Sequence, residues 1–390
     1  MIKNEKITIL IATEYLNEGG VGRQIQYLVN HLDHTRFDLH LAIFRGKDLF
    51  FTELLASQKV RAQVLNPGRR IGIRTWFELV RLCRELKPDI LHLFGGKANH
   101  LGGFMSFFCH VPVVIFSVRS ANNRTTNHIL YRFLKSRQTL TIVNSHGIKK
   151  ELVGHAGYRD QDVLVMHNFL HTGTFRPYSE SQRLAVRQRL GFAAGTCLVA
   201  CVGRIARQKN QIATLQALKQ LKDTGQLPEN FKFLFVGRSY DALYASKVRR
   251  LYHALGLQDV SCFLEPVEDV VSLYNALDGI FQPSTYEGLS NVVIEAQACG
   301  VPVSLSCEAD NDGLVRDRET GIAFSIANDL EVVQALARLI ELCMDQERRR
   351  QITARARAAV QNRFSLQRDI VALQEIYVGL LERRRRGRRP

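Results

Sequence analysis

Short apolar runs alternate with amphipathic segments along almost the whole chain, and this alternation constrains the fold more than any other feature. In the first part, strands are predicted at residues 7–12, 37–44, 62–65, 90–93, 113–116, 140–143 and 163–166. Helical periodicity lies between them, most clearly at residues 20–32, 76–86 and 127–134. Strands that alternate with helices form a parallel sheet covered on both faces. The pattern therefore predicts a doubly wound α/β domain.

A polar stretch at residues 171–181 separates this domain from a second alternation of the same kind. Its strands are predicted at residues 197–202, 231–236, 260–264, 280–282, 302–305 and 322–324, followed by helices at 330–343, 346–363 and 366–382. A chain of 390 residues also exceeds what one hydrophobic core usually holds. We predict two Rossmann-like domains, residues 1–170 and 171–365, then the helix 366–382 and a basic tail at 383–390.

The net charge of +16 calls for an anionic partner, and six arginines lie in residues 383–389. Nucleic acid, an anionic membrane surface and an acidic substrate all fit such a charge. The tail itself has two interpretations, a solvated disordered end or a segment attracted to lipid.

The spacing of the cysteines and the length of the apolar runs bear on the cellular location of the protein. The eight cysteines show no paired spacing and are expected to be reduced core residues of a cytoplasmic protein. The longest apolar tract, residues 104–118, is interrupted and too short to span a membrane. We therefore expect a cytoplasmic protein. Attraction of its basic segments to anionic lipid would place it peripherally at the inner face of the cytoplasmic membrane.

Residues 283–296 combine the end of a strand, a tight loop and the start of a helix. Gly288 opens the loop, and Ser290 or Asn291 is placed to begin the helix. The backbone N–H groups of Leu289, Ser290 and Asn291 would then be donors at the positive end of the helix dipole. Such a helix start binds a diphosphate without a metal.

Two carboxylates and two cations accompany this helix start. Glu287 precedes the helix and Glu295 lies on its second turn, so they are expected to hold different parts of one ligand. A solvent-facing acid pair is the alternative. After a buried strand, the sequence Gly203-Arg204 leads to Lys209, whose ammonium and the Arg204 guanidinium can grip a pyrophosphate. No divalent ion is then needed.

These motifs resemble the donor site of retaining glycosyltransferases with the GT-B fold, in the glycogen synthase-like family 4. The resemblance extends through residues 19–23, 144–147, 296–303, 320–321 and 364–365 and so covers nearly the whole chain. It implies two Rossmann-like domains that face a central cleft, with helix 366–382 packed back on the first. It also implies transfer from a nucleotide-diphosphate sugar, expected to be a UDP-sugar, to a lipid-linked, surface-polysaccharide or lipopolysaccharide acceptor.

The resemblance also assigns roles to residues, with Glu287, Arg204 and Lys209 as the catalytic set. Glu287 lies beside the donor sugar, Glu295 accepts hydrogen bonds from the ribose, and the backbone near Val267 meets the base. A capping turn for the next helix is the alternative at that position. The implied donor-binding residues are Gly20, Gly203, Val267, Gly288, Leu289, Ser290, Asn291 and Glu295. No metal or other cofactor is implied, and the nucleotide sugar is a co-substrate.

The chain departs from the family pattern at two places. Many relatives carry a histidine after the fifth strand, where this chain has Ser117-Val118-Arg119. Arg119 is therefore a candidate contact for an anionic donor or acceptor group, with pairing to surface acids as the alternative. His92 and His100 are neighbouring candidates, although a lone histidine is more often structural.

Residues 307–315 stand where relatives more commonly have a pair of glycines and a glutamate. The identity of the transferred sugar is therefore left undefined. The pairs Asp310-x-Asp312 and Asp160-x-Asp162 match the metal-binding spacing of the other glycosyltransferase fold, GT-A, but such spacing arises easily by chance.

Basic and apolar residues mix in segments 69–77 and 119–137, which the resemblance connects to membrane docking. Ordinary amphipathic helices with a buried apolar side are the alternative. The expected partners are thus the donor, a glycan or lipid-linked acceptor and an anionic membrane surface. Two other functions stay open: a GT-B nucleotide-sugar epimerase and a basic nucleic-acid-binding protein, although no specific nucleic-acid motif occurs.

Overall fold

The computed structural model describes residues 6–16, 20–45, 60–66, 71–119, 138–239 and 241–386. The chain forms two compact units, the first made of residues 1–169 and 366–390 and the second of residues 170–365. The predicted domain boundary at residue 170 lies next to this division. The helix predicted at 127–134 falls outside the described residues.

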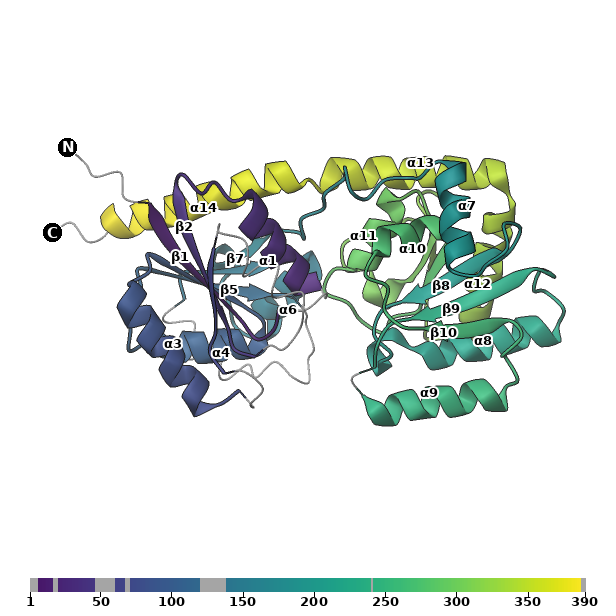
Figure 1. The fold of residues 1–390 in the computed structure, drawn as a ribbon, viewed down its shortest axis with the longest axis horizontal. Coiled ribbons are helices and arrows are strands. Elements are labelled where there is room, and N and C mark those ends of the chain that lie inside the picture. Colours follow the sequence, from purple (N-terminus) through teal and green to yellow (C-terminus); the bar gives the residue numbers. More distant parts are fainter. Residues whose placement is uncertain are drawn as a thin grey trace. The chain divides into compact units, whose positions relative to one another are not determined.

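The first unit contains a seven-stranded parallel sheet in the order β3-β2-β1-β4-β5-β6-β7. Figure 1 labels β1, β2, β5 and β7 of this sheet. Its strands are β1 (Ile7–Thr13), β2 (Phe37–Ile43), β3 (Arg61–Val64), β4 (Ile90–Phe94), β5 (Val113–Val118), β6 (Leu140–Val143) and β7 (Val163–Val165). The prediction of a doubly wound parallel sheet is confirmed, with strand ends that shift by at most two residues.

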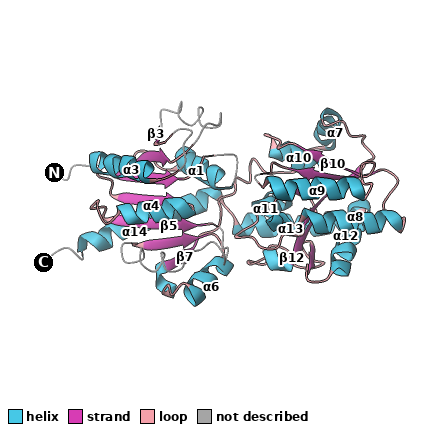
Figure 2. Ribbon diagram, turned by 90° about the horizontal axis from the view of Figure 1, so that it is seen from below, coloured by secondary structure: helices cyan, strands magenta, loops and turns pink. Residues whose placement is uncertain are grey.

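Helices cover both faces of this sheet, and Figure 2 shows α3 and α4 on one of them. They are α1 (Gly20–His31), α3 (Ile73–Leu86), α4 (Gly96–Met105), α6 (His146–His155) and α14 (Leu366–Arg386). Ile9 and Ile11 of β1 pack in the core with α1 and α14. Leu10 and Ala12 point the other way and pack with α3 and α4. Alternate residues of each strand thus serve two cores.

Helix α14 is joined to the sheet by a buried hydrogen-bonded histidine. His92 of β4 is 1% exposed, with its Nδ1 2.7 Å from the Tyr377 hydroxyl and its Nε2 2.8 Å from the Ser117 hydroxyl. Burial, with a smaller contribution from Arg119, holds the pKa of His92 well below its usual range. The structural interpretation of His92 is therefore confirmed.

Helix α14 also extends beyond its predicted end. It continues to Arg386, so Arg383–Arg386 are exposed but helical. The interpretation of the whole segment 383–390 as a disordered tail is wrong for these four residues. Leu381 is still buried against the sheet core, which anchors the helix just before the arginines begin.

The second unit contains a six-stranded parallel sheet in the order β10-β9-β8-β11-β12-β13. Its strands are β8 (Cys197–Val202), β9 (Phe231–Val236), β10 (Ser261–Leu264), β11 (Gly279–Gln282), β12 (Val303–Ser306) and β13 (Ile322–Phe324). Its helices are α7 (Glu180–Arg189), α8 (Gln211–Asp223), α9 (Ala242–Ala254), α10 (Val270–Ala276), α11 (Asn291–Ala298), α12 (Asp329–Met344) and α13 (Gln346–Arg363). The second predicted doubly wound sheet is confirmed as well.

Side chains alternate between two cores in this sheet too. Val199 packs with α8, α9 and α12, whereas Leu198 and Ala200 pack with α10, α11 and α13.

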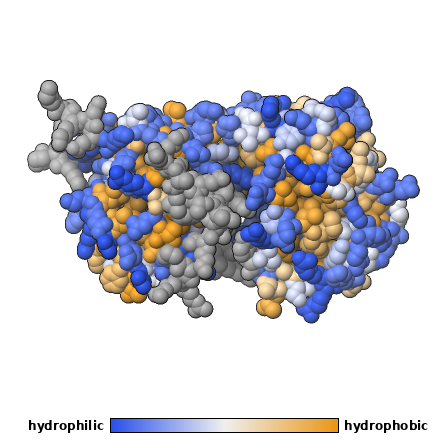
Figure 3. All heavy atoms as spheres, in the orientation of Figure 1, coloured by the Kyte–Doolittle hydropathy of each residue, from blue (hydrophilic) through white to orange (hydrophobic). Residues whose placement is uncertain are grey.

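On the face drawn in Figure 3, hydrophilic residues cover much of the described surface and hydrophobic residues gather in separate patches. Within the described ranges, no helix combines the length and apolar character needed to cross a bilayer.

A buried arginine ties the first helix of the second unit to its sheet. Arg187 of α7 is 1% exposed and pairs with Asp278 at 2.5 Å. It also donates to the carbonyl oxygens of Ala276, Ala194 and Thr196 at 2.8–2.9 Å. A buried guanidinium with a carboxylate and three carbonyl partners is fully compensated, which is the pattern of a structural residue.

The His92 contacts predict a pH dependence of stability. Because the folded state keeps His92 neutral, the unfolded chain binds the extra proton below pH 6.5, its ordinary pKa. The free energy of unfolding should be level above that pH and then fall by about 1.4 kcal/mol per pH unit on acidification. Urea unfolding at about pH 7.5 and pH 5.5 measures this slope.

The variant His92→Gln should lack this part of the slope, since glutamine does not titrate. His110→Gln is the matched control, because His110 is exposed. An equal acid slope in His92→Gln and in the unaltered protein would contradict the prediction.

Candidate functional site

Except for Gly20, the predicted donor residues lie toward the carboxyl end of the second sheet, where strand order reverses. Strand β8 lies between β9 and β11, so chain connections leave in opposite directions from β8 and β11. Open α/β sheets bind ligands at such a switch point. Gly203 and Arg204 follow β8, and residues 283–290 follow β11. The topology alone therefore brings these two loops together.

The loop after β8 depends on a glycine. Gly203 has φ +141°, and a Cβ at this position would lie 2.9 Å from Cε of Lys209. Any side chain would therefore both strain the backbone and displace the lysine. A single 3₁₀ turn, Arg207–Lys209, then leads into α8, and it turns the Lys209 side chain back beneath Gly203.

Lys209 and Glu287 form a buried ion pair between the two loops. Lys209 Nζ lies 2.5 Å from Glu287 Oε1, and the two side chains are only 10% and 11% exposed. The backbone supports the pair, since Thr285 N donates to the Gln208 carbonyl oxygen at 2.8 Å. Asn311 Nδ2 donates to the Glu287 carbonyl oxygen at 2.7 Å. The predicted cation and carboxylate thus lie in one cluster.

Gln208 connects the remaining predicted cation to this cluster. Its Nε2 donates to Glu287 Oε2 at 3.0 Å and to the Tyr286 carbonyl oxygen at 2.9 Å. Its Oε1 accepts from Nη2 of the exposed Arg204 at 3.2 Å. The sequence analysis missed Gln208, because an uncharged side chain gives no electrostatic signal. Its place directly before Lys209 was the available clue.

Helix α11 begins where the sequence predicts. Ser290 is the N-cap residue and α11 starts at Asn291. Ser290 is buried, and its side chain makes no capping hydrogen bond to the first turn. The serine hydroxyl therefore leaves the first-turn amides to other acceptors, at the positive end of the helix dipole. Gly288 and Leu289 are also buried in this turn.

Glu295 occupies a different environment from Glu287. It is 5% exposed on the second turn of α11, where its Oε2 accepts from the Tyr274 hydroxyl at 2.9 Å. Tyr274 comes from α10 and is 1% exposed. The two predicted carboxylates are therefore held by different partners. Tyr274 is a second residue that the sequence analysis missed, because its apolar surroundings indicated only a core position.

The predicted base contact lies in the loop between β10 and α10. Val267 is half-buried there. Asp269 caps α10, since its carboxylate accepts from Ser272 N at 2.9 Å. The alternative of a capping turn is thus confirmed for Asp269, and the role of Val267 stays a prediction.

The cysteine nearest the ion pair is a protonated core thiol. Burial raises the pKa of Cys201 to about 12, with Lys209 lowering it and Glu287 raising it. It therefore supplies no thiolate at neutral pH. The eight cysteines are free, as expected, but Cys307 is exposed, so the prediction that all are core residues is wrong for that one.

In the first unit, two predicted residues lie at the carboxyl end of the sheet. Gly20 opens α1 after β1 and is exposed. Arg119 follows β5, where its Nη1 donates to Asn168 Oδ1 at 2.6 Å and its guanidinium lies 5.4 Å from the centre of the Phe94 ring. The alternative of pairing with surface acids is wrong within the described residues, because no carboxylate contacts Arg119 there.

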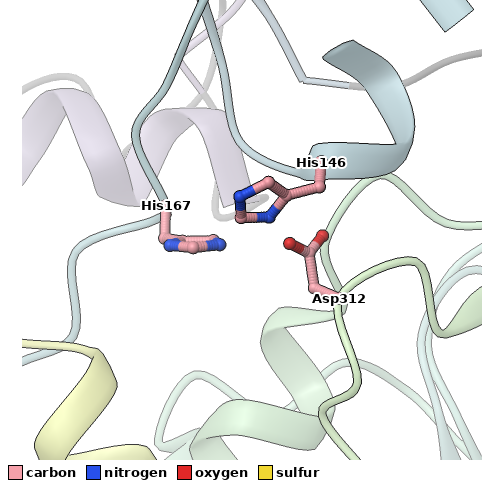
Figure 4. A group of neighbouring side chains, drawn as sticks. All are labelled: His146, His167 and Asp312. Carbon is pink, nitrogen blue, oxygen red and sulfur yellow. The ribbon is translucent and has the colours of Figure 1, made fainter. Parts of the chain in front are cut away.

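Two histidines lie at the same edge of the first sheet. His146 begins α6 and His167 follows β7, with ring centres 5.6 Å apart (Figure 4). Asp312, also drawn in Figure 4, belongs to the second unit.

The acids with metal-like spacing have protein partners. Asp310 accepts from the backbone N–H groups of Leu314 and Val315, and Asp312 pairs with Arg363 at 3.0 Å. Asp160 and Asp162 pair with Lys149 and Arg159 at 2.9 and 2.7 Å. These contacts account for the four acids as local structural groups.

Comparison with solved structures gives the class of fold. The crystal structure of Anabaena Alr3699/HepE in complex with UDP and glucose matches with a TM-score of 0.82 at 22% identity, over 96% of this chain and 100% of that one. Two doubly wound units with this similarity define a protein of the GT-B fold, as predicted.

Sequence comparison then gives the family. The family model "Glycosyl transferases group 1" matches residues 182–359, and "Glycosyltransferase Family 4" matches residues 18–173. The chain belongs to the family 4 glycosyltransferases and is a hexosyltransferase.

Two relatives illustrate its place in the family. The UDP-Gal:alpha-D-GlcNAc-diphosphoundecaprenol alpha-1,3-galactosyltransferase of Escherichia coli is 23% identical over 79% of this chain and 80% of that protein. The capsular polysaccharide biosynthesis glycosyltransferase CapM of Staphylococcus aureus is 22% identical over 96% of this chain and 97% of that protein.

The buried ion pair generates a prediction about stability. Lys209→Met removes the cation and leaves the Glu287 carboxylate buried beside a single amide, which should lower the free energy of unfolding by about 3–5 kcal/mol. Lys209→Met combined with Glu287→Gln should recover part of that loss, because no uncompensated charge is left. Denaturant unfolding of the single and double variants measures the coupling.

Additive losses in the double variant would show that the two side chains do not interact. Lys219→Met is a matched control, since Lys219 lies on α8 and pairs only at the surface with Asp223.

Proposed function

We propose that the chain is a retaining glycosyltransferase that moves a sugar from a UDP-sugar to a lipid-linked or surface-glycan acceptor without a metal ion. One observation carries the proposal: Arg204, Gln208, Lys209 and Glu287 form one hydrogen-bonded network at the switch point of the second sheet. The names of the relatives support the donor and acceptor classes, since one relative is named for UDP-Gal and a diphosphoundecaprenol acceptor. The HepE complex with UDP and glucose supports the same donor class.

The network suits the departure of a diphosphate. Negative charge grows on the leaving group as the bond to the sugar breaks. The Arg204 guanidinium, the Lys209 ammonium and the first-turn amides of α11 are fixed donors for that charge. An ammonium has three N–H donors, so its bond to Glu287 leaves two for phosphate oxygens.

The two carboxylates are suited to bind the two sugar groups of the donor, the transferred sugar and the ribose. Glu287, held by Lys209 and Gln208, would accept from hydroxyls of the transferred sugar. Glu295, oriented by Tyr274, would accept from the ribose hydroxyls. In the retaining scheme we propose, the departing oxygen deprotonates the acceptor hydroxyl, which attacks on the face that the diphosphate leaves. Glu287 then needs no covalent role.

Arg204→Ala tests this proposal, because it removes an exposed donor at little structural cost. The free energy of unfolding should change by less than about 0.5 kcal/mol. The value of kcat/KM for UDP release from UDP-glucose or UDP-galactose should fall about 100- to 1,000-fold, as for loss of one fixed donor in the transition state. Turnover of both UDP-sugars is measured in excess EDTA, in which the unaltered protein should keep its full rate.

Arg207→Ala is the matched control, since Arg207 is an exposed arginine in the same loop between β8 and α8. Undiminished turnover in Arg204→Ala, or loss of turnover in EDTA, would refute the proposed mechanism. Conversion of the UDP-sugar into its epimer without acceptor would identify an epimerase instead.

We also propose that the first unit docks on an anionic membrane surface. Four large apolar side chains on or beside α3 and α4 are strongly exposed: Ile73 by 75%, Phe77 by 58%, Phe104 by 45% and Phe108 by 47%. Trp76 packs between them, with ring centres 5.0 Å from Phe77 and 5.3 Å from Phe108. We call this group the aromatic patch.

Charge around the aromatic patch favours lipid as its partner. Arg74 and Arg84 are exposed on the same helix α3, so cations flank the apolar side chains, whereas the exposed Arg81 is paired with Glu85 at 2.8 Å. Apolar side chains flanked by cations bind the interface of anionic bilayers. Of the two predicted basic segments, 69–77 is described from Ile71 onward and contributes to the patch. Segment 119–137 lies outside the described residues after Arg119.

The aromatic patch predicts vesicle binding that depends on Phe77 and Phe104. The double variant Phe77→Ser, Phe104→Ser should bind vesicles of phosphatidylglycerol and phosphatidylcholine at least about tenfold more weakly, since burying one such side chain is worth about 1.5–3 kcal/mol. Cosedimentation measures the binding. Leu243→Ser is the control, because Leu243 is 81% exposed in the second unit. Equal binding by the double variant would exclude the patch as the docking surface.

A further inference from the structure

Within the described residues, Arg119 is a cation without a counter-charge at the carboxyl edge of the first sheet. Its Nη1 bonds to a neutral amide oxygen, Asn168 Oδ1, at 2.6 Å. Its Nε is buried and has no hydrogen-bond partner in the described part of the chain. The residue as a whole keeps part of its surface exposed. A ligand can therefore reach a guanidinium that the described residues leave uncompensated.

The charge of Arg119 persists at neutral pH. Burial lowers the pKa of Arg119 to about 10, and Tyr377 acts in the opposite direction. The side chain is therefore protonated in the folded protein. A buried guanidinium without a carboxylate or a full set of acceptors destabilises the fold, because the lost hydration is not replaced.

Comparison with Arg187 shows what a structural buried arginine looks like in the same chain. Arg187 has a carboxylate partner in Asp278 and three carbonyl acceptors. Arg119 has one amide acceptor and the face of the Phe94 ring. The protein thus satisfies one buried guanidinium completely and leaves the other short of acceptors. A side chain kept at such a cost is more consistent with binding than with packing.

The location of Arg119 limits what it can bind. It directly follows β5, and the ends of parallel strands are where α/β sheets bind ligands. Asn144 Nδ2, after β6, lies 3.4 Å from the Arg119 carbonyl oxygen, so further amide groups border the position. A planar guanidinium matches the paired oxygens of phosphate and carboxylate groups. The donor diphosphate already has its own cations in the second unit, Arg204 and Lys209.

We propose that Arg119 binds an oxyanion of the acceptor, either a phosphate group or the carboxylate of an acidic sugar. This inference rests on the proposed glycosyltransferase function and names the chemical class of its acceptor. A neutral sugar acceptor would leave the guanidinium uncompensated, whereas an oxyanion supplies the missing acceptors.

The first arm of the test separates binding from structure. Arg119→Met keeps the length of the side chain and removes its charge, so the free energy of unfolding of the ligand-free protein should stay level or rise. Arg187→Met should lower it, because Asp278 would lose one of its three arginine partners and the carbonyl oxygens of Ala276, Ala194 and Thr196 would lose their buried donor. If Arg119→Met is destabilised as much as Arg187→Met, Arg119 is a structural residue and the proposal is overturned.

The second arm measures anion binding by thermal shift, since a ligand of the folded state raises the melting temperature. The probes are inorganic phosphate, N-acetylglucosamine 1-phosphate and glucuronate, with neutral N-acetylglucosamine as the control. At least one anionic probe should raise the melting temperature of the unaltered protein, and its Kd should weaken at least tenfold in Arg119→Met. A response to the sugar phosphate alone identifies a phosphate acceptor, and a response to glucuronate alone identifies an acidic sugar.

Two comparisons keep this inference distinct from the proposed function. Arg204→Ala should retain the shift caused by the anionic probe, and Arg119→Met should retain the shift caused by UDP. Anion binding without any UDP binding would refute the UDP-sugar proposal and leave the Arg119 site standing. No anionic shift in the unaltered protein, or an equal shift in Arg119→Met, would overturn the Arg119 site whatever UDP does.

Discussion

The arrangement of the candidate site depends on one buried ion pair, Lys209 with Glu287. The pair joins the loop after β8 to the loop after β11, which are the two loops that the reversal of strand order brings together. Each partner would be costly to bury alone, so each loop needs the other to hold its charged side chain out of water. Gly203 makes this possible, because only a residue without Cβ leaves room for the lysine. The geometry of Arg204 follows from the pair, since Gln208 holds the arginine to the same carboxylate.

The buried polar residues of this chain differ in how completely the protein supplies their hydrogen-bond partners, and this difference helps to distinguish structural residues from functional ones. His92, Arg187 and Asp278 are buried and their polar atoms have partners, so they join elements of the core. Glu295 and Lys209 are also buried, but they lie at loop and helix ends on the ligand side of the second sheet. Arg119 lies at the corresponding edge of the first sheet and lacks a counter-charge in the described residues. Position at the carboxyl edge and incomplete compensation together indicate a binding role better than burial alone.

The sequence predicted strands and charged site residues well, because both have strong local signals. Every strand of the two described sheets lies within two residues of its predicted bounds, and Lys209 and Glu287 meet as the motifs suggested. Gln208 and Tyr274 escaped prediction because their partners are distant in sequence: Glu287 lies 79 residues from Gln208, and Glu295 lies 21 residues from Tyr274. An uncharged side chain shows no local sign of such a partner. The helical state of Arg383–Arg386 was also missed. A run of like charges suggests a solvated, irregular end, and the sequence does not show that Leu381, just before the run, is buried against the sheet.

The ion pair also bears on how the donor would be recognised under the proposed function. Without ligand, the Lys209 ammonium neutralises Glu287, and Gln208 occupies the other carboxylate oxygen. An arriving diphosphate would share the lysine, so the carboxylate would lose part of its compensation when the leaving group binds. Its remaining lone pairs would then be stronger acceptors for sugar hydroxyls than before. Binding of the diphosphate and binding of the sugar would thus strengthen each other through one ammonium group, without any movement of the backbone. A free diphosphate or a free sugar would lack this coupling, which favours the intact nucleotide sugar over its fragments.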